Sequence, residues 1–253
     1  MKLVRFVYQG AEALGTLKGE EISLCEGSLF GELKETGMVI KAAEVHFLPP
    51  VKPEKVLCVG LNYMDHVVES KVEKPELPVI FSKGPGTVIG ARDEIRYPVK
   101  MSKRVDYEGE LAVVIGKTAR DVEEGEAAAY ILGYTCANDV TARDLQTDIN
   151  QWTVAKGFDT FCPLGPCIAT DLDPGNLEIR LTLNGEERQH SNTRHLLFKP
   201  TYLVSYLSHI FELHPGDVIL TGTPEGIGPM EIGDMVTVEI EGIGALTNVV
   251  GKR

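Results

Sequence analysis

The chain has 253 residues, slightly more than one hydrophobic core usually holds, so we expect one large domain with a small appendage. Hydrophobic residues make up 43% and charged residues 25%, a globular composition that excludes a disordered, collagen-like or coiled-coil protein. The formal net charge of −12 does not provide the basic surface that nucleic acid requires. The sequence has no apolar run of membrane-spanning length, no recognisable signal peptide and no Cys-x-x-Cys pair, so we expect a cytoplasmic protein without membrane contact.

The beginning of the chain predicts a small β domain. Residues 1 to about 25 alternate apolar and polar positions between turns at Gly10 and Gly19, which is typical of three short antiparallel strands. Residues 28–35 predict a short helix. Residues 47–53 contain three prolines, which neither a helix interior nor a central strand accepts, so they are the expected linker. We therefore place a small N-terminal β domain at residues 1–52 and a larger domain at residues 53–253.

The larger domain is predicted to consist mainly of strands. Apolar or alternating patterns predict strands at residues 55–59, 111–115, 177–183, 236–240 and 245–250. The pair Asn184-Gly185 is a strong hairpin signal. Short helices are predicted at residues 65–70 and, between two prolines, at residues 201–212. The irregular spacing of the strands indicates a mainly β (α+β) fold with a closed or rolled architecture rather than a doubly wound sheet.

Several familiar enzyme motifs are incomplete or missing. Residues 115–118 resemble the end of a phosphate loop, but Leu111 stands where its first glycine is required. The glycines of residues 84–90 have the wrong spacing for a dinucleotide loop. The chain contains neither Gly-x-Ser-x-Gly nor His-Glu-x-x-His, so serine-hydrolase and zinc-protease chemistry lack their usual residues.

Two carboxylates directly precede the apolar strand at residues 111–115. Side chains two residues apart share one face of an extended backbone, so Glu108 and Glu110 are predicted to point the same way. Beside a buried strand they repel each other unless a cation lies between them or one is protonated. The alternative is a solvated strand end with water between the charges, and a third carboxylate is needed to decide.

Asp139 is the candidate for this third carboxylate, because it follows the strand-like run at residues 132–138. Three carboxylates from two strands are typical ligands of Mg²⁺ or Mn²⁺. They leave about three of six coordination positions for a chelating substrate such as a 2-oxo acid. Zinc fits less well, because no paired Cys or His stands nearby at ligand spacing.

A histidine and a carboxylate share one face of the helix predicted at residues 65–70. His66 and Glu69 are three residues apart, within hydrogen-bonding reach on a helix. A histidine oriented by a carboxylate is a competent general base. The alternative is a surface histidine with a nearby glutamate and no catalytic role.

Five sequence blocks together resemble the fumarylacetoacetate hydrolase family. They are Gly60-Leu-Asn-Tyr-Met-Asp-His66-Val-Val-Glu69, Asp106-Tyr-Glu-Gly-Glu110, Asn138-Asp-Val-Thr-Ala-Arg-Asp-Leu-Gln146, Lys156-Gly-Phe-Asp159 and Leu220-Thr-Gly-Thr-Pro-Glu225. The blocks follow the family's order over roughly residues 55–250. The resemblance implies a mixed β-roll and β-sandwich catalytic domain, a homodimer, and a metal ion at Glu108, Glu110 and Asp139.

The resemblance also implies roles for further residues. His66 and Glu69 would form a catalytic dyad in a segment that closes over the substrate, and Lys156 would help to carry the charge of an enolate. Around the chelated acid, the implied pocket residues are Arg143, Gln146, Thr223 and, with lower rank, Lys83. For Thr223, a plain turn after the predicted strand at residues 218–220 explains the pattern equally well.

From these observations we expect an enzyme that uses Mg²⁺ or Mn²⁺ and acts on a small 2-oxo dicarboxylic acid or an acylpyruvate. The expected reaction is hydrolysis of a carbon–carbon bond through a metal-bound enolate. A decarboxylase or an isomerase or tautomerase on the same class of substrate, such as oxaloacetate or 2-hydroxyhepta-2,4-diene-1,7-dioate, stays open. The third alternative is a non-catalytic β domain with a structural cation site.

Overall fold

The computed structural model describes residues 1–147 and 151–252. The strands are β1 Lys2–Tyr8, β2 Ala11–Lys18, β3 Glu21–Gly27, β4 Leu33–Lys41, β5 His46–Phe47, β6 Val56–Gly60, β7 Val79–Lys83, β8 Val88–Ile89, β9 Glu94–Tyr97, β10 Val105–Tyr107, β11 Gly109–Ile115, β12 Ile131–Asn138, β13 Thr141–Ala142, β14 Cys162–Ala169, β15 Glu178–Leu183, β16 Glu186–Asn192, β17 Val218–Leu220, β18 Gly228–Met230, β19 Met235–Ile240 and β20 Gly244–Lys252. The helices are α1 Met64–Glu69, α2 Thr153–Lys156 and α3 Pro200–Ser208. Short 3-10 turns lie at Ala42–Glu44, Pro85–Thr87, Ala127–Tyr130, Arg143–Leu145 and Thr193–His195.

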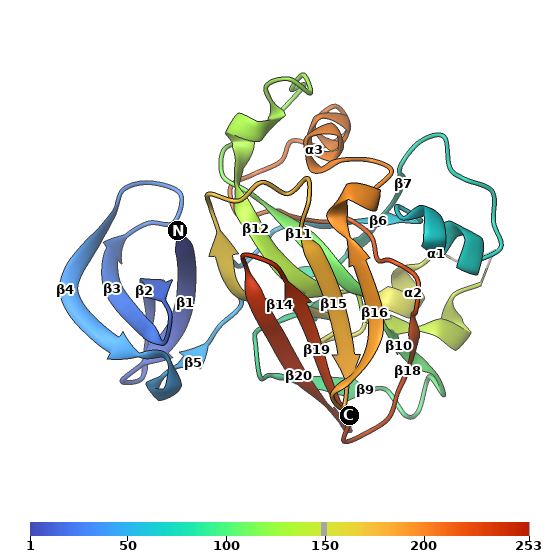
Figure 1. Ribbon diagram of the computed structural model, residues 1–253, viewed down its shortest axis with the longest axis horizontal. Helices are drawn as coiled ribbons and strands as arrows, with labels where there is room; N and C mark the ends of the chain where they lie inside the picture. Colours follow the sequence, from blue (N-terminus) through green and yellow to red (C-terminus); the bar gives the residue numbers. More distant parts are fainter. Residues whose placement is uncertain (148–150, 253) are drawn as a thin grey trace.

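Across the described residues, the strands pair into three sheets. The largest has the order β4-β3-β2-β1-β14-β12-β11-β17-β6-β7, with β5 beside β1 and β8 beside β14. A second sheet has the order β16-β15-β19-β20-β9, and a small third one the order β13-β10-β18. Figure 1 shows β15, β19 and β20 stacked in front of β11, β12 and β14. Residues such as Val113 and Leu181 therefore share one hydrophobic core between the two layers, and the predicted mainly β fold is confirmed.

The N-terminal strands form a meander at the left of Figure 1. The three predicted strands are confirmed as β1, β2 and β3. The helix predicted at residues 28–35 is wrong, because the chain turns at Ser28 and continues as β4, which pairs with β3 from Leu33 onward. Pairing with a neighbouring strand here outweighs the local helical pattern. Strand β1 also pairs with β14, with Leu3 opposite Ile168, so the meander continues the large sheet.

Predicted elements of the larger domain agree with the structure except at one helix end. Every residue of β11 is buried, as its continuous apolar sequence predicts. Asn184 and Gly185 both have positive φ angles, 54° and 83°, which the tight turn between β15 and β16 requires. The helix predicted at residues 201–212 ends at Ser208, because the backbone then turns to pair Leu213 with Ala119.

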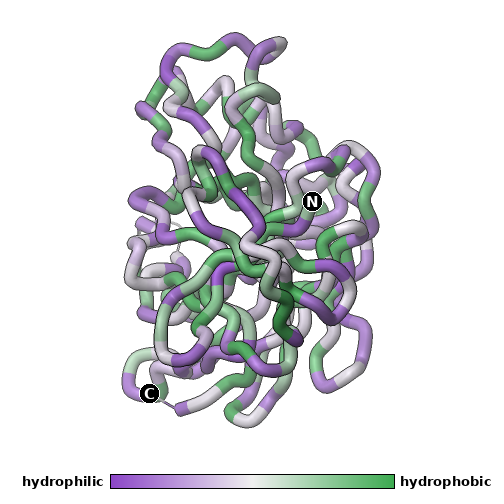
Figure 2. The backbone as a smooth tube through the Cα atoms, turned by 90° about the vertical axis from the view of Figure 1, so that its left-hand side faces the viewer, coloured by the Kyte–Doolittle hydropathy of each residue, from purple (hydrophilic) through white to green (hydrophobic). Residues whose placement is uncertain are grey.

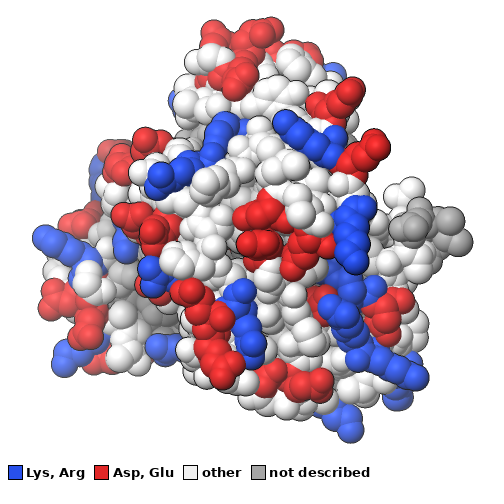
Figure 3. Space-filling view, turned by 45° about the vertical axis from the view of Figure 1, so that its right-hand side comes forward, with Lys and Arg blue, Asp and Glu red and all other residues white. Residues whose placement is uncertain are grey.

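The distribution of polarity follows this layered arrangement. Figure 2 shows hydrophobic stretches through the middle of the molecule and many hydrophilic residues in the outer loops. On the face in Figure 3, acidic and basic side chains are interspersed. Within the described ranges, no helix combines the length and the apolar character needed to cross a bilayer.

Candidate active site

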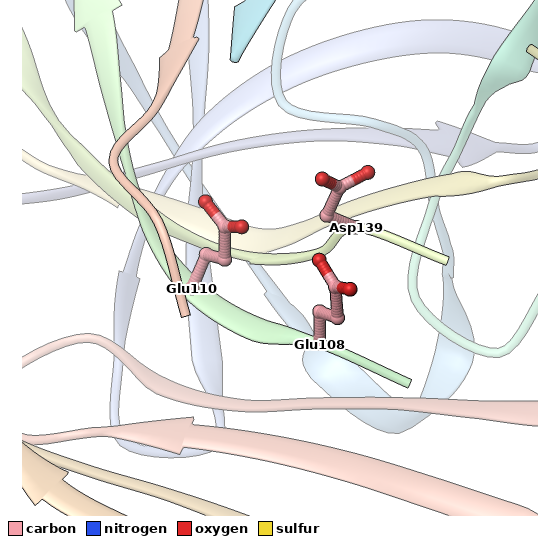
Figure 4. Close-up of side chains that lie close together, drawn as sticks. All are labelled: Glu108, Glu110 and Asp139. Carbon is pink, nitrogen blue, oxygen red and sulfur yellow. The ribbon is translucent and has the colours of Figure 1, made fainter. Parts of the chain in front are cut away.

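Three buried carboxylates lie together at the end of the β11–β12 pairing formed by Gly109 and Asn138. Glu108 and Glu110 are 5% and 2% exposed and lie two residues apart at the start of β11, so they share a face as predicted. Asp139 follows β12, and its N–H donates to the Glu108 carbonyl at 2.8 Å. The antiparallel register therefore brings Asp139 opposite Glu108. One oxygen from each carboxylate lies within 4.8 Å of the others, and Figure 4 shows the three groups converging.

The three carboxylates have different electrostatic surroundings. Burial alone would raise the pKa of Glu108, but the charges of Lys156 and Arg143 outweigh it and hold this pKa far below its usual range. Glu110 accepts a hydrogen bond from the Gly222 N–H at 2.6 Å, and among the described residues no cationic side chain pairs with it. Burial, followed by the negative charges of Asp139 and Glu108, raises the pKa of Glu110 well above its usual value.

This donor set fits a hard divalent cation. All three candidate ligand atoms are carboxylate oxygens, the type that Mg²⁺ and Mn²⁺ prefer. Glu110 is buried and forms no ion pair within the described ranges, which is costly for an ionised carboxylate. A divalent cation between the three groups would relieve both the desolvation and the mutual repulsion. The alternative of a solvated strand end disagrees with the burial of Glu108 and Glu110.

Helix α1 places a histidine and a glutamate beside this centre. His66 is 7% exposed, and its Nδ1 lies 2.9 Å from Oε2 of Glu69, at the spacing that the sequence predicts. Oε1 of Glu69 accepts a hydrogen bond from the Gly226 N–H at 3.0 Å. Because a carboxylate accepts hydrogen bonds, this contact places a proton on Nδ1, and in the neutral imidazole the free electron pair is then on Nε2.

A cavity of about 260 Å³ joins the histidine to the three carboxylates. Predicted residues that line it are His66, Glu108, Glu110, Asp139, Arg143, Gln146, Lys156 and Thr223. Its other lining residues are mainly apolar and include Val59, Leu61, Val72, Phe81 and Trp152. The cavity thus combines charged side chains with an apolar wall, a composition suited to a small organic acid.

Lys156 donates its hydrogen bonds to the carboxylate cluster and to a neighbouring hydroxyl group. At the end of α2, its ammonium group donates to Oε2 of Glu108 at 2.9 Å, Oδ2 of Asp139 at 2.6 Å and the Thr141 hydroxyl at 2.8 Å. An ammonium group has three donors, so all of them are used within the protein. Burial would lower the pKa of Lys156, but Asp139 and Glu108 raise it above its usual value. This raised pKa favours the charged form of Lys156 beside the carboxylates that line the cavity.

Arg143 is the second positively charged side chain that lines the cavity. Its guanidinium group binds Asp106 at 2.9 Å and also donates to Glu108 and to the side chain of Gln146. Gln146 and Thr223 line the cavity with Arg143, as the resemblance implies. These polar groups border the three carboxylates on the side that faces the cavity.

Lys83, expected in the pocket with lower rank, contacts the carboxylate cluster from outside the cavity. It ends β7 at 3% exposure, where its ammonium group donates to Asp139 and to the Val140 carbonyl. Within the described ranges it is not part of the cavity wall. Strand β7 pairs with β6 at the edge of the large sheet, and this pairing fixes the backbone of Lys83. Lys83 can therefore hold the Asp139 carboxylate in place.

The apolar wall is the part of the site that sequence analysis missed. Trp152 packs edge-to-face against Phe81, with ring centroids 5.1 Å apart. A side chain at Gly60 would approach the Trp152 ring to 2.7 Å, so glycine is needed there. Trp152 is the single tryptophan of the chain and lies four residues before Lys156. These two facts could have identified it from the sequence as a candidate pocket residue. From the sequence, Val72 and Phe81 could not be told from ordinary core residues.

Comparisons with known proteins show the family to which the chain belongs. The family model described as fumarylacetoacetate (FAA) hydrolase C-terminal matches residues 55–251, and one described as Rv2993c-like, N-terminal, matches residues 1–50. The mitochondrial oxaloacetate tautomerase of Xenopus laevis is 40% identical over 262 aligned residues, which cover 98% of this chain and 78% of that protein.

Solved structures share the complete fold. The 2-hydroxyhepta-2,4-diene-1,7-dioate isomerase of Mycobacterium marinum is 42% identical with a TM-score of 0.93, over 100% of this chain and 99% of that chain. The maleylpyruvate hydrolase of a Sphingobium species, solved with a manganese(II) ion and pyruvate, is 29% identical with a TM-score of 0.84 over the same shares. The chain therefore belongs to the fumarylacetoacetate hydrolase family of enzymes.

Proposed function

We propose that this protein interconverts the keto and enol forms of a small 2-oxo dicarboxylic acid, with oxaloacetate as the first candidate, and that it requires Mg²⁺ or Mn²⁺. The observation that carries the proposal is that His66, held by Glu69, faces the same small cavity as the three carboxylates. The name of the Xenopus laevis relative, whose match covers nearly the whole chain, supports this choice of substrate.

Glu108, Glu110 and Asp139 would hold the cation. When bound, a divalent cation would supply Lewis-acid chemistry, which makes the C3–H of a 2-oxo acid more acidic. The neighbouring positive charges of Lys156 and Arg143 lower the cost of the negative charge that develops on the substrate.

His66 is the group that moves the proton. With its Nδ1 proton shared with Glu69, Nε2 accepts the proton from C3 of the keto acid, and the electron pair of the C–H bond forms the C2–C3 double bond. His66 then returns this proton from Nε2 to the oxygen on C2, which completes the enol, and the reverse sequence restores the keto acid. Because His66 is 7% exposed, bulk water competes little with this transfer.

Hydrolysis of a carbon–carbon bond, the reaction expected from the sequence, is the second candidate. The fold shared with a maleylpyruvate hydrolase that binds manganese(II) and pyruvate favours it. In this reaction His66 would remove a proton from water rather than from C3, and the water would attack the carbonyl carbon of the acyl group. The carbon–carbon bond then breaks, and the 2-oxo acid part leaves as an enolate, which takes up a proton. The two reactions use the same residues and differ in the molecule that gives its proton to His66, which is the substrate in one case and water in the other.

One set of assays separates these reactions. The purified protein is given oxaloacetate with Mg²⁺ or Mn²⁺, the enol absorbance is followed, and pyruvate is measured with lactate dehydrogenase. We expect faster equilibration of keto and enol forms, with no more pyruvate than the same cation produces without the protein. Pyruvate formation would instead identify a decarboxylase, and cleavage of maleylpyruvate with no effect on oxaloacetate would identify a hydrolase. Either result, or no effect with either cation, overturns the tautomerase proposal.

A further inference from the structure

A buried glutamine outside the cavity connects the carboxylate cluster to the segment that receives Glu69. Gln189 lies on β16, in the second sheet, and is 1% exposed. Its Oε1 accepts a hydrogen bond from the Gly109 N–H at 2.9 Å. Gly109 stands between the two glutamates, so this bond fixes the backbone that carries both of them.

The amide nitrogen of Gln189 binds the other partner. Nε2 donates to the Thr223 hydroxyl and to the Pro224 carbonyl, both at 2.8 Å. The Thr223 hydroxyl in turn donates to the Gly109 carbonyl at 3.0 Å. Gln189, Thr223 and Gly109 thus close a ring of three hydrogen bonds, in which each polar group is satisfied without water.

The segment at residues 221–226 contacts both halves of the site. Near its start, the Gly222 N–H binds Glu110 at 2.6 Å, and at its end the Gly226 N–H binds Glu69 at 3.0 Å. Gly226 has a φ of +94°, and a side chain there would approach the Arg188 carbonyl to 2.2 Å. The segment therefore lies directly on the β16 backbone beside Gln189, and its position sets where Glu69 can dock.

We infer that Gln189 is a positioning residue, which holds the 221–226 segment in register with the carboxylate strand so that Glu69 docks only when the carboxylates are in place. The inference rests on the proposed function of these carboxylates and of the His66–Glu69 pair. Gln189 touches neither the cavity nor the reacting atoms within the described ranges, so it acts through Gly109, Thr223 and Pro224.

The chain offers a matched control for its removal. Asn248, on β20, is 2% exposed, and its amide also donates to two backbone carbonyls, those of Gly90 at 2.9 Å and Asp93 at 2.8 Å. Gln189→Met and Asn248→Leu both replace a buried amide by an apolar side chain of similar size. Both leave buried backbone groups without partners, so both lower the melting temperature.

The two variants and the unaltered full-length protein are compared without substrate. Hydrogen exchange of residues 61–78 reports the docking of α1, and calorimetric titration with Mn²⁺ reports the carboxylate cluster. For Gln189→Met we expect roughly tenfold faster exchange of this segment and roughly tenfold weaker Mn²⁺ binding, the lower end of what outer partners of metal ligands contribute. For Asn248→Leu we expect neither change.

The inference is overturned if Gln189→Met leaves either quantity unchanged, or if Asn248→Leu alters both equally. Should Gln189→Met not fold, Gln189→Glu retains the acceptor for Gly109 but loses the donors to Thr223 and Pro224. It must then show the faster exchange, and unchanged exchange refutes the inference. Because no substrate is used, these results stand apart from the tautomerase assays, and a failure of one proposal is distinguishable from a failure of the other.

Discussion

Glu69→Gln tests the geometry around the proposed base directly. The two oxygens of Glu69 accept from His66 Nδ1 at 2.9 Å and from the Gly226 N–H at 3.0 Å. A carboxylate offers an acceptor to each donor, whereas an amide offers one oxygen and one NH₂ group. The glutamine variant must therefore either place a donor against a donor at one of these contacts or donate to Nδ1, which moves the imidazole proton to Nε2. We expect His66 to be held less well and kcat to fall.

The structure gives the size of this loss. A hydrogen bond to a charged group contributes about 1.5–3 kcal/mol. The Glu69 side chain is 32% exposed, so water partly replaces the lost contact and the lower end applies. About 1.5 kcal/mol corresponds to roughly a tenfold decrease in kcat.

The assay is the equilibration of keto and enol oxaloacetate at saturating substrate, with Glu73→Gln as the control. Glu73 is an exposed carboxylate in the same segment, so this variant makes the same chemical change away from the site. We expect Glu73→Gln to keep full kcat. An unchanged kcat in Glu69→Gln, or an equal loss in both variants, would refute the assignment of Glu69 as the residue that orients His66.

Four further predictions concern the base, the cation and the cavity. His66→Ala should lower kcat by about 10²–10⁴-fold and leave Mn²⁺ affinity, measured by calorimetry, unchanged, because no carboxylate ligand is altered; equal loss of Mn²⁺ would contradict this role. Mn²⁺ at about a hundred times its Kd should add about 2.7 kcal/mol of stability, roughly 5–10 °C in Tm, and a chelator should remove it; an unchanged Tm in a thermal scan would count against the site. Because the pKa of Glu110 is raised in the fold, its contribution to the stability of the metal-free protein is present below its unfolded pKa and is lost as pH rises through the folded value. The Tm of chelator-treated protein should therefore fall over that range while Mn²⁺ affinity increases, and the opposite slopes would refute this. Trp152 lines the cavity, so binding of a 2-oxo acid should change the tryptophan emission, and a constant spectrum at saturation would exclude binding there.

The carboxylate cluster was the most predictable part of the site. The two-residue period of a strand places Glu108 and Glu110 on one face, and this relation depends only on the local backbone. The spacing of His66 and Glu69 is equally local. Asp139 was a good candidate because it follows the next strand, which pairs antiparallel with β11. These predictions depend on one or two neighbouring elements.

Other features depend on contacts distant in sequence and could not be read from a local pattern. Residues 28–35 have a helical pattern, but the chain from Leu33 onward pairs with β3 and forms strand β4. Lys83 lies behind Asp139 because of how β7 enters the large sheet. Gln189 resembles any polar residue of a hairpin, and only the packing of the second sheet against the first brings it to Gly109. Such residues need the tertiary structure.

The pairing of β1 with β14 has a practical consequence for shortened chains. Leu3 and Lys2 occupy the backbone hydrogen-bonding groups of β14 near Ile168 and Ala169, and Arg5 donates to the Pro49 carbonyl at 2.6 Å. Deleting residues 1–52 would uncover part of a strand edge in the sheet that carries the carboxylates. Unpaired strand edges recruit strands from other molecules, so the shortened protein is expected to self-associate. The N-terminal strands thus protect the catalytic sheet against intermolecular strand addition, and point substitutions rather than deletion are the way to study them.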